Sequence, residues 1–279
     1  MKKLLLVFSA LALVLSSCSK SDSAPVAQED PAVLATNVLL KKIITSQGTT
    51  VVNTATNVYN GNKLVEIVGT NGDKAIYTYT GDLITKIEEY TGTTLNNIET
   101  LTYDTSQKLA SYVKIDYDTF SGTPSGYRVV YTYDGSGNII YSAFNGSATL
   151  QNTPASSGKA TITNGNITTI IKNYLAVPQV SSAYTQTQTI TYDDKINPGN
   201  NITGFYKVTL QGTDIGLAGS IHNILNVTTN NGTYNTSIDE SNYTYNTNNY
   251  PATEVNISKS FNSSGIVTFS SSFSNQYTY

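Results

Sequence analysis

Cys18 is the only cysteine of the chain and the residue with the clearest potential chemistry. A thiol can be acylated, oxidised or bound to a metal, but a single cysteine excludes disulfides within the chain and clusters of thiolate ligands. It follows a basic start at Lys2-Lys3, an apolar run from Leu4 to Leu15, and two small residues. These are the three parts of a secretory signal, and the run is shorter than the ~20 apolar residues that span a bilayer. We therefore expect residues 1–17 to be removed as a signal peptide.

The four residues Leu15-Ser16-Ser17-Cys18 resemble the lipobox of bacterial lipoproteins. The resemblance implies that the mature chain begins at Cys18, with a diacylglycerol on its sulfur and usually a further acyl chain on its amine. Several chains hold a protein firmly at a membrane, because each buried methylene contributes ~0.8 kcal/mol. Residues 18–35, rich in Ser, Ala, Pro and Asp, are predicted to form a flexible tether and residues 36–279 the folded domain. The expected location is the cell envelope, lipid-anchored to the outer membrane.

Other candidate catalytic side chains lack partners at a useful spacing. His222, the one histidine, has no neighbours at metal or catalytic-triad spacing, which favours a strand-packed or solvent-facing role. Asp116 and Asp118 would share one face of a strand, whereas Glu88-Glu89 and Asp239-Glu240 would each point to opposite faces. A glycosidase needs two carboxylates facing each other across a cleft, and no such arrangement can be derived from the sequence. We expect no catalytic residue.

The segment from Tyr192 to Asn200 is rich in oxygen atoms that could wrap a calcium ion. It lacks the spacing of a strong calcium motif, however, and Asp193-Asp194, Asn, Pro and Gly are ordinary turn residues, so a turn is favoured. No glycine-rich phosphate loop precedes a helix, which leaves nucleotide binding without support. The net formal charge is −3 and the charges are scattered, so no surface suited to nucleic acid is expected. The sequence predicts neither a metal site nor a cofactor.

The elements that must position these residues are predicted to be β-strands. The chain holds 21 tyrosines against 7 phenylalanines and no tryptophan, among abundant Thr, Asn, Ser and Gly. Threonine and tyrosine suit a half-buried strand, while Asn and Gly suit tight turns, so we expect almost no helix. From about residue 57 onward the chain repeats an apolar or aromatic residue followed by Thr and Tyr. The six copies are Tyr77-Thr78-Tyr79, Leu101-Thr102-Tyr103, Tyr131-Thr132-Tyr133, Ile190-Thr191-Tyr192, Tyr243-Thr244-Tyr245 and Tyr277-Thr278-Tyr279, with a degenerate copy at Thr161-Ile162-Thr163.

Most copies continue into a turn and a second β-prone run. Tyr133-Asp134-Gly135-Ser136-Gly137-Asn138, for example, leads into Ile139-Ile140-Tyr141. A strand, a turn of Gly, Asn and Asp residues, and a second strand make a hairpin, so each unit is predicted to be one hairpin. From Tyr127 to Asp134 the odd positions carry Tyr, Val, Tyr and Tyr, and the even positions Arg, Val, Thr and Asp. One face of the sheet is therefore expected to be aromatic and the other mostly polar.

The run Tyr131-Thr132-Tyr133-Asp134 with Gly137 looks like one unit of the bacterial Tyr-Asp repeat, also called the YD or Rhs-type repeat. Tyr103-Asp104 and Tyr192-Asp193 keep the Tyr-Asp pair, whereas other copies carry Thr80 or Asn246 instead of Asp. The match covers roughly residues 57–279, and with the lipobox it resembles a group of uncharacterised outer-membrane lipoproteins. The resemblance implies an all-β fold of consecutive antiparallel hairpins. We expect them to form one long twisted or curled sheet, either an open half-barrel or a superhelical meander.

Two roles are open for the tyrosines. They can form the core, with each hydroxyl at the edge of the sheet, or they can line a surface that stacks on sugar rings or on an extended peptide. The leading hypothesis is a non-catalytic, membrane-anchored lipoprotein that binds glycan or extended peptide. The alternatives are an envelope assembly protein that pairs through its sheet edge and, third, a carboxylate-based glycosidase. The expected contact residues lie where a long aromatic-rich connection interrupts the repeat, at Tyr112, Tyr117, Phe120 and Tyr127.

Overall fold

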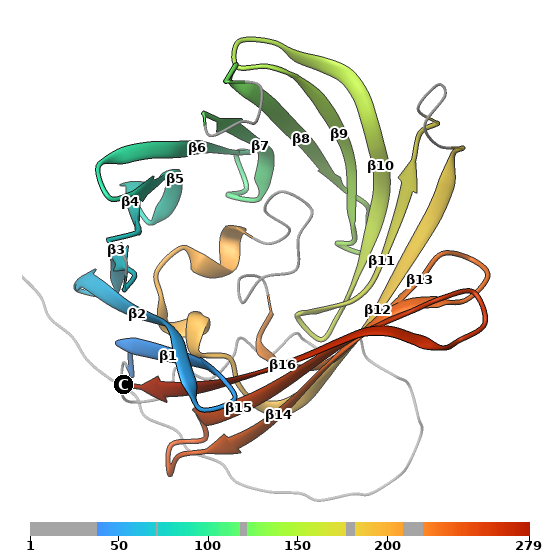
Figure 1. Ribbon diagram of the computed structural model, residues 1–279. Helices are drawn as coiled ribbons and strands as arrows, with labels where there is room; N and C mark the ends of the chain where they lie inside the picture. The colour runs from blue at the N-terminus through green and yellow to red at the C-terminus, as the bar shows by residue number, and fades with distance from the viewer. Residues whose placement is uncertain (1–37, 71, 118–121, 177–181, 209–219) are drawn as a thin grey trace, which may run out of the picture. The chain divides into compact units, whose positions relative to one another are not determined.

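The computed structural model describes residues 38–279, apart from 71, 118–121, 177–181 and 209–219. These residues form one antiparallel sheet of sixteen strands that closes into a barrel, with two 3-10 helices (Figure 1). No helix in this part of the chain is long and apolar enough to cross a bilayer. The elements are β1 (Lys42–Gln47), β2 (Thr50–Asn60), β3 (Lys63–Val68), β4 (Lys74–Thr80), β5 (Leu83–Thr91), β6 (Thr94–Tyr103), β7 (Leu109–Asp116), β8 (Ser125–Tyr133), β9 (Ile139–Ser147), β10 (Gln151–Thr163), β11 (Asn166–Tyr174), β12 (Tyr184–Ile196), η1 (Pro198–Asn201), η2 (Phe205–Val208), β13 (His222–Asn230), β14 (Asn235–Tyr245), β15 (Pro251–Phe261) and β16 (Val267–Thr278).

The barrel closes between its first and last strands. β1 pairs antiparallel with β16, with Lys42 opposite Thr278 and Ser46 opposite Ser274, and the remaining neighbours follow the order of the chain. The prediction of an all-β fold of antiparallel hairpins is confirmed, but the open half-barrel or superhelical meander is wrong. The closing strand β1 precedes the repeat, and a hairpin pattern specifies only the pairing of neighbouring strands. Closure depends on tilt and stagger around the whole sheet.

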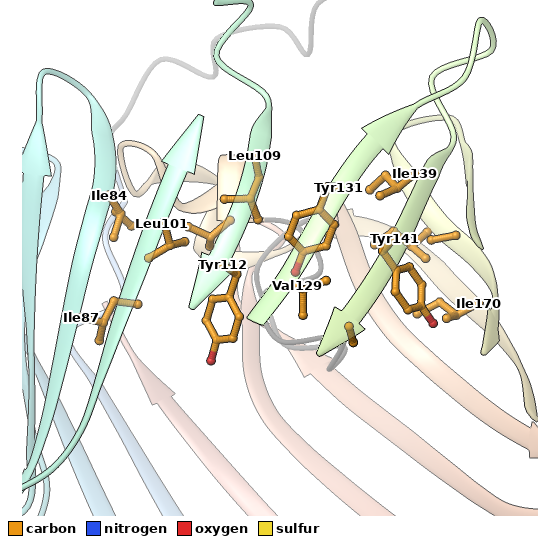
Figure 2. Close-up of a cluster of buried hydrophobic side chains, with 14 of the residues drawn as sticks. Ile84, Ile87, Leu101, Leu109, Tyr112, Val129, Tyr131, Ile139, Tyr141 and Ile170 are labelled. Carbon is orange, nitrogen blue, oxygen red and sulfur yellow. The ribbon is translucent and has the colours of Figure 1, made fainter. Parts of the chain in front are cut away.

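Alternation along the strands divides the barrel wall into an inner and an outer face. On β8, Val129 and Tyr131 belong to the main buried cluster, whereas Thr132 between Tyr131 and Tyr133 is exposed. The same cluster includes Val208 of η2, which lies inside the barrel, so the cluster marks the inner face (Figure 1). Figure 2 shows members of this cluster along the wall from β5 to β11. The expected aromatic and polar faces are therefore confirmed, and the aromatic face points inward.

Four turns of the barrel share one hydrogen-bond pattern, which explains the Asp of the Tyr-Asp unit. In the β8–β9 turn, Oδ1 of Asp134 accepts hydrogen bonds from the backbone N–H groups of Ser136 (2.9 Å) and Asn138 (3.0 Å). The fourth residue of the turn, Gly137, has a φ of 81°, a left-handed conformation that glycine adopts without strain. Hydrogen bonds from the side chains of Asn138 and Lys159 hold the pKa of Asp134 below its usual range. The corresponding turns begin at Asp104, Asn246 and Asn262.

Replacing Asp104 with alanine is expected to destabilise the barrel by about 1–2 kcal/mol. The change leaves the N–H groups of Ser106 and Lys108 without the acceptor that now lies 2.8 and 2.9 Å away, and each such hydrogen bond is worth about 0.5–1.5 kcal/mol. Urea unfolding would measure the loss. Asp82 is the matched control, because its carboxylate is exposed and pairs only with Lys63 at 3.1 Å. Asp82→Ala should stay within about 0.5 kcal/mol. Equal losses for both variants would contradict the role given to the turn.

Tyrosine hydroxyl groups join consecutive hairpins at one end of the barrel. The Tyr133 hydroxyl donates to the carbonyl of Leu109 at 2.9 Å, which links the end of β8 to the start of β7. The degenerate repeat at Thr163 has lost this tyrosine, and Oδ1 of Asn138 instead accepts the backbone N–H of Ile162 at 3.1 Å. We call this end the latched end. The same bond runs from Tyr59 to Leu40, Tyr103 to Ile84, Tyr192 to Ile167 and Tyr279 to Pro251.

The described part of the connection from β12 to β13 folds into the barrel at the latched end. Its residues 198–208, which include η1 and η2, we call the inner cap. The cap contacts four turns of the latched end, namely β2–β3, β4–β5, β10–β11 and β14–β15. At the first of these turns, the Thr203 N–H donates to the Asn62 carbonyl at 2.9 Å. At Gly204, with a φ of 77°, a Cβ atom would lie 2.5 Å from the carbonyl oxygen of Asp82. Only glycine permits that approach, so the cap is fitted closely across this end.

Candidate functional site on the inner wall

Of the four residues expected to contact a ligand, the three that the structure describes differ in their exposure. Tyr112 on β7 is only 3% exposed, because it lies within the main buried cluster. Tyr127 on β8 is half-buried against the same cluster, so both residues face the interior. Tyr117, 40% exposed, lies just beyond the end of β7, where its N–H donates to the carbonyl of Asn96 at 2.7 Å. Phe120 lies outside the described residues.

The strand register extends the inner face well beyond the predicted tyrosines. Leu101, Tyr112 and Val129 lie directly opposite one another on β6, β7 and β8. The same row continues through Ala143 and Ser156 to Tyr174 on β11 and Tyr184 on β12. A second inner row places Tyr131 opposite Tyr141. We call six of the inward-facing tyrosines of β7 to β12, which lie away from the latched end, the aromatic strip. Its members are Tyr112, Tyr127, Tyr131, Tyr141, Tyr174 and Tyr184.

A glycine on β10 allows the aromatic strip to continue across that strand. Tyr141 is 1% exposed, and its hydroxyl reaches over β10 to the carbonyl of Ile171 on β11 at 3.4 Å. Beneath it, a Cβ atom on Gly158 would lie 2.4 Å from that hydroxyl. Burial raises the pKa of the Tyr141 phenol, with smaller contributions from Tyr127 and Tyr174. The phenol stays protonated, and therefore acts only as packing and as a hydrogen-bond donor.

The accessible end of the strip is a stacked pair of rings. The ring centroids of Tyr174 and Tyr184 are 4.5 Å apart and the planes differ by 12°. The Nζ atom of Lys172 lies 4.8 Å from the centroid of the Tyr174 ring, and the Tyr174 hydroxyl donates to Oε1 of Gln186 at 3.4 Å. Tyr184 remains 45% exposed. This group, the tyrosine platform, therefore offers an aromatic face beside a cation and an amide.

The inner wall next to the strip is acidic. On β5 and β6, Nδ2 of Asn97 donates to Oε2 of Glu89 at 2.6 Å, and Glu99 follows on the same face of β6. Opposite them on β7 lie Asp116 and Lys114, which form an ion pair at 3.5 Å. Burial, and then the charges of Glu89 and Glu99, raise the pKa of the nearby Tyr77 phenol. This part of the wall presents carboxylate and amide oxygens, which suit the hydroxyl and amide donors of a polar ligand.

A cavity adjoins the acidic part of the wall. Its volume is about 440 Å³, within the range of small-molecule sites. It lies toward the end of the barrel away from the inner cap, near the β3–β4 and β5–β6 turns. Two carboxylates and several amide groups line it, so polar ligands are favoured over apolar ones. The lining residues are Val52, Asn53, Ala55, Ile67, Gly69, Asp73, Lys74, Ala75, Glu89, Tyr90, Thr91 and Asn96.

The single histidine and the oxygen-rich loop have structural roles. Nδ1 of His222 lies 2.8 Å from Nδ2 of Asn166, at the start of β13, as expected for a strand-packed histidine. Asp193 accepts hydrogen bonds from the N–H groups of Lys195 and Asn223, the Asn223 side chain and the Tyr245 hydroxyl. These four donors occupy its oxygen atoms. Asp193 and Asp194 nevertheless lie within β12, where the register with β13 shifts between Tyr192 and Ile196, so the predicted turn is wrong for these two residues. Within the described ranges, no group of three or more His, Cys, Asp or Glu side chains is placed to hold a metal ion.

The paired carboxylates lie as strand geometry predicts. Glu88 pairs with Lys86 on the outer face at 2.9 Å, whereas its neighbour Glu89 faces inward to Asn97. Asp239 likewise accepts from Ser258, while Glu240 pairs with Lys259 at 2.9 Å. The prediction that neighbouring carboxylates point to opposite faces is confirmed for both pairs. Asp118, the proposed companion of Asp116, lies outside the described residues.

The closed ring of sixteen antiparallel strands, with one long connection folded into its interior, can be compared with solved structures. The fold is that of porin-like barrels. A porin-like protein from Bacteroides vulgatus has a TM-score of 0.54 and 14% identity, covering 86% of this chain and 98% of that one. A porin-like protein from Bacteroides uniformis has a TM-score of 0.51 and 12% identity, covering 86% and 96%. At such identities the likeness shows the fold alone. No protein-family model and no curated protein matches the chain.

The sequence pattern contained part of the signal for the tyrosine platform. Tyr184 begins a strand after a long connection, and Tyr174 ends the strand before it. Only the register places Tyr174 opposite Tyr184, and that register follows from the β11–β12 pairing rather than from the Tyr-Thr-Tyr repeat. Tyr112 and Tyr127 were predicted to be ligand contacts, and the structure places both against the buried cluster of the inner wall. Their burial in a porin-like barrel wall leaves the exposed rings elsewhere on the strip.

Proposed function

We propose that this chain is a non-catalytic, lipid-anchored barrel of the cell envelope that binds a glycan or an extended peptide on its inner wall. The observation that carries the proposal is the tyrosine platform, where Tyr174 and Tyr184 stack beside Lys172 and Gln186. Ligand sites combine aromatic surfaces with a few fixed polar groups on a largely preformed surface. The lipobox and the porin-like fold support an envelope location. The described polar groups favour binding over turnover, because catalysis needs placed groups with tuned proton affinity.

Arrays of glycans and of extended peptides, probed with the purified mature protein, would test the proposal. We expect a hit in one of the two arms, and Tyr184→Ala should weaken binding of that hit about fivefold to tenfold. The loss corresponds to about 1–1.4 kcal/mol, as expected for one stacked aromatic contact. Thr185→Ala is the matched control, because Thr185 is the next residue of the same strand and bonds to Asn173 instead. Its affinity should be unchanged.

The remaining outcomes of the array experiment distinguish between ligand binding, glycosidase activity and an assembly role. Prolonged incubation of a hit should return it intact. A cleaved product, lost when Asp116 or Glu89 is replaced, would favour the carboxylate-based glycosidase. Equal weakening by Tyr184→Ala and Thr185→Ala would remove the platform from the site. No hit in either arm would favour an assembly role.

One observation supports that assembly role as a second candidate. β1 pairs with β16 only from Ser274 to Thr278, so in the described part of the chain Val267–Phe273 of β16 pair with β15 alone. Charged residues and prolines usually protect free strand edges from pairing. This segment has neither, because it consists of Val, Thr, Ser and Phe. Phe269 there is 59% exposed. Although the barrel is closed, an extended partner strand could pair with this short edge.

A further inference from the structure

The outer face of the wall can be followed residue by residue through the strand register. Thr161, half-buried on the side opposite the inner cluster, lies directly opposite Thr169 on β11, and the same row crosses the next five strands. Seven strands contribute to this row and only Ile238 in it is apolar. In chain order the row is Thr161, Thr169, Thr189, Thr228, Ile238, Lys259 and Ser270.

A second outer row, displaced along the strands, has the same character. It runs from β6 to β12, and Val130 is its one apolar member. The row comprises Thr102, Ser111, Val130, Ser142, Ser157, Asn173 and Thr185. Between the two rows lie Ile140 and Ile171, with the charged Lys159 directly between them. In these rows the apolar residues are separated by polar and charged ones, whereas Ile98 and Ile115 on β6 and β7 lie directly opposite each other.

Charged side chains also lie on other strands of the outer wall. Lys86 and Glu88 on β5 pair at 2.9 Å, and Lys259 on β15 pairs with Glu240 on β14 at the same distance. On β8 the guanidinium of Arg128 lies 4.8 Å from the centroid of the Phe144 ring. These ion pairs and contacts connect neighbouring outward positions within the strands.

This pattern is the reverse of that found in barrels that span membranes. Their strands alternate apolar side chains toward lipid with polar side chains toward the lumen, and an apolar band about 25 Å tall surrounds the barrel. Here the inner row from Leu101 to Ala143 is buried and mostly apolar. The outer rows are rich in Thr, Ser, Asn and Lys. Threonine and serine hydroxyl groups without protein partners are best satisfied by water.

We propose that the outer wall of the barrel faces water over its whole height. The barrel therefore stands beside the membrane instead of spanning it, although its strand order is that of porin-like proteins. It is a container whose lumen is crossed at the latched end by the inner cap, and it is not a pore through a bilayer. This inference concerns the outer face alone, so it does not depend on which ligand the inner wall binds.

Cysteine substitution in the full-length chain would test the proposal. Ser142→Cys, Thr189→Cys and Ser270→Cys place thiols at exposed outward positions on β9, β12 and β16. In opened membranes from expressing cells, a charged, membrane-impermeant maleimide should label all three within about threefold of the rate for Ser136→Cys, which lies in an exposed turn. Ala143→Cys on the buried inner wall should react at least about tenfold more slowly. The unsubstituted chain gives the background due to Cys18.

If the thiols at the three wall positions react with the maleimide only after detergent is added, the proposal is overturned.

A second measurement tests whether the outer wall tolerates added charge. Thr189→Lys and Thr228→Lys add charge to the middle of the outer wall, and we expect an unchanged amount of folded protein in the membrane fraction. Asn231→Lys, in the β13–β14 turn, is the control and should stay folded. Loss of folded protein in both wall variants, but not in the control, would show that the outer wall needs an apolar surrounding.

Discussion

Replacing Cys18 with alanine should abolish acylation of this chain and block its maturation by the lipoprotein route. The expected result is complete, because no other thiol is present to accept the diacylglycerol. Several acyl chains provide the membrane affinity, at ~0.8 kcal/mol for each buried methylene. Metabolic labelling with a fatty acid and detergent phase partitioning would measure the two effects. Ser17→Ala, beside the predicted cleavage site, is the control and should still be labelled.

Membrane fractionation also bears on the position of the barrel relative to the membrane. A Lys or Arg facing lipid at the midplane costs about 2–4 kcal/mol, while the net stability of a folded protein is about 5–15 kcal/mol. Lys86, Lys159 and Lys259 lie on the outer wall. Placing these side chains in lipid would therefore cancel much of the free energy of folding. A chain that begins after Cys18, and therefore has neither the leader nor the anchor, would contradict the proposed water-facing wall if it still stayed in the membrane fraction. A labelled Cys18→Ala band of unchanged intensity would instead refute the anchor.

Local features of the fold were predictable because each depends on a few neighbouring residues. The alternation from Tyr127 to Asp134 gave the correct faces of β8, and the Asp134 turn required only the Asp and Gly137 spacing. Closure was not predictable in the same way. It requires β1, which lies before the repeat, to meet the terminal strand near Thr278, and that meeting depends on twist and stagger accumulated over sixteen strands.

The candidate site shows the same limit. Composition indicated that tyrosines would be either core or ligand surface, and the inner face holds both buried and exposed tyrosines. Tyr112 is core, because the facing strands pack residues such as Leu101 and Val129 around it. Tyr184 is exposed, because it lies at a strand end beside the β11–β12 connection. Whether a given tyrosine is covered depends on residues distant in sequence, which a period-2 pattern does not specify.

The tripeptide from Tyr131 to Tyr133 gives the sharpest test of the inner and outer faces. Tyr133→Ala should destabilise the barrel by about 3 kcal/mol, the range of buried large-to-small aromatic changes. The ring packs against the main buried cluster, its hydroxyl donates to Leu109, and Nζ of Lys108 lies 4.7 Å from its centroid. Burial raises the pKa of this phenol to about 12, in keeping with a covered, protonated group. Thr132→Ala, on the exposed face, should stay within about 1 kcal/mol.

Tyr133→Phe separates the ring from the hydrogen bond at the latched end. It keeps the packing and removes only the bond to the Leu109 carbonyl, so the expected loss is about 1 kcal/mol. Urea unfolding of the chain that begins after Cys18, followed by circular dichroism, would measure all three variants. Similar losses for Tyr133→Ala and Thr132→Ala would mean that the strand register is wrong by one residue, since such a slip exchanges the two faces. A loss for Tyr133→Phe as large as that for Tyr133→Ala would show that the hydroxyl bonds, and not the buried rings, hold consecutive hairpins together.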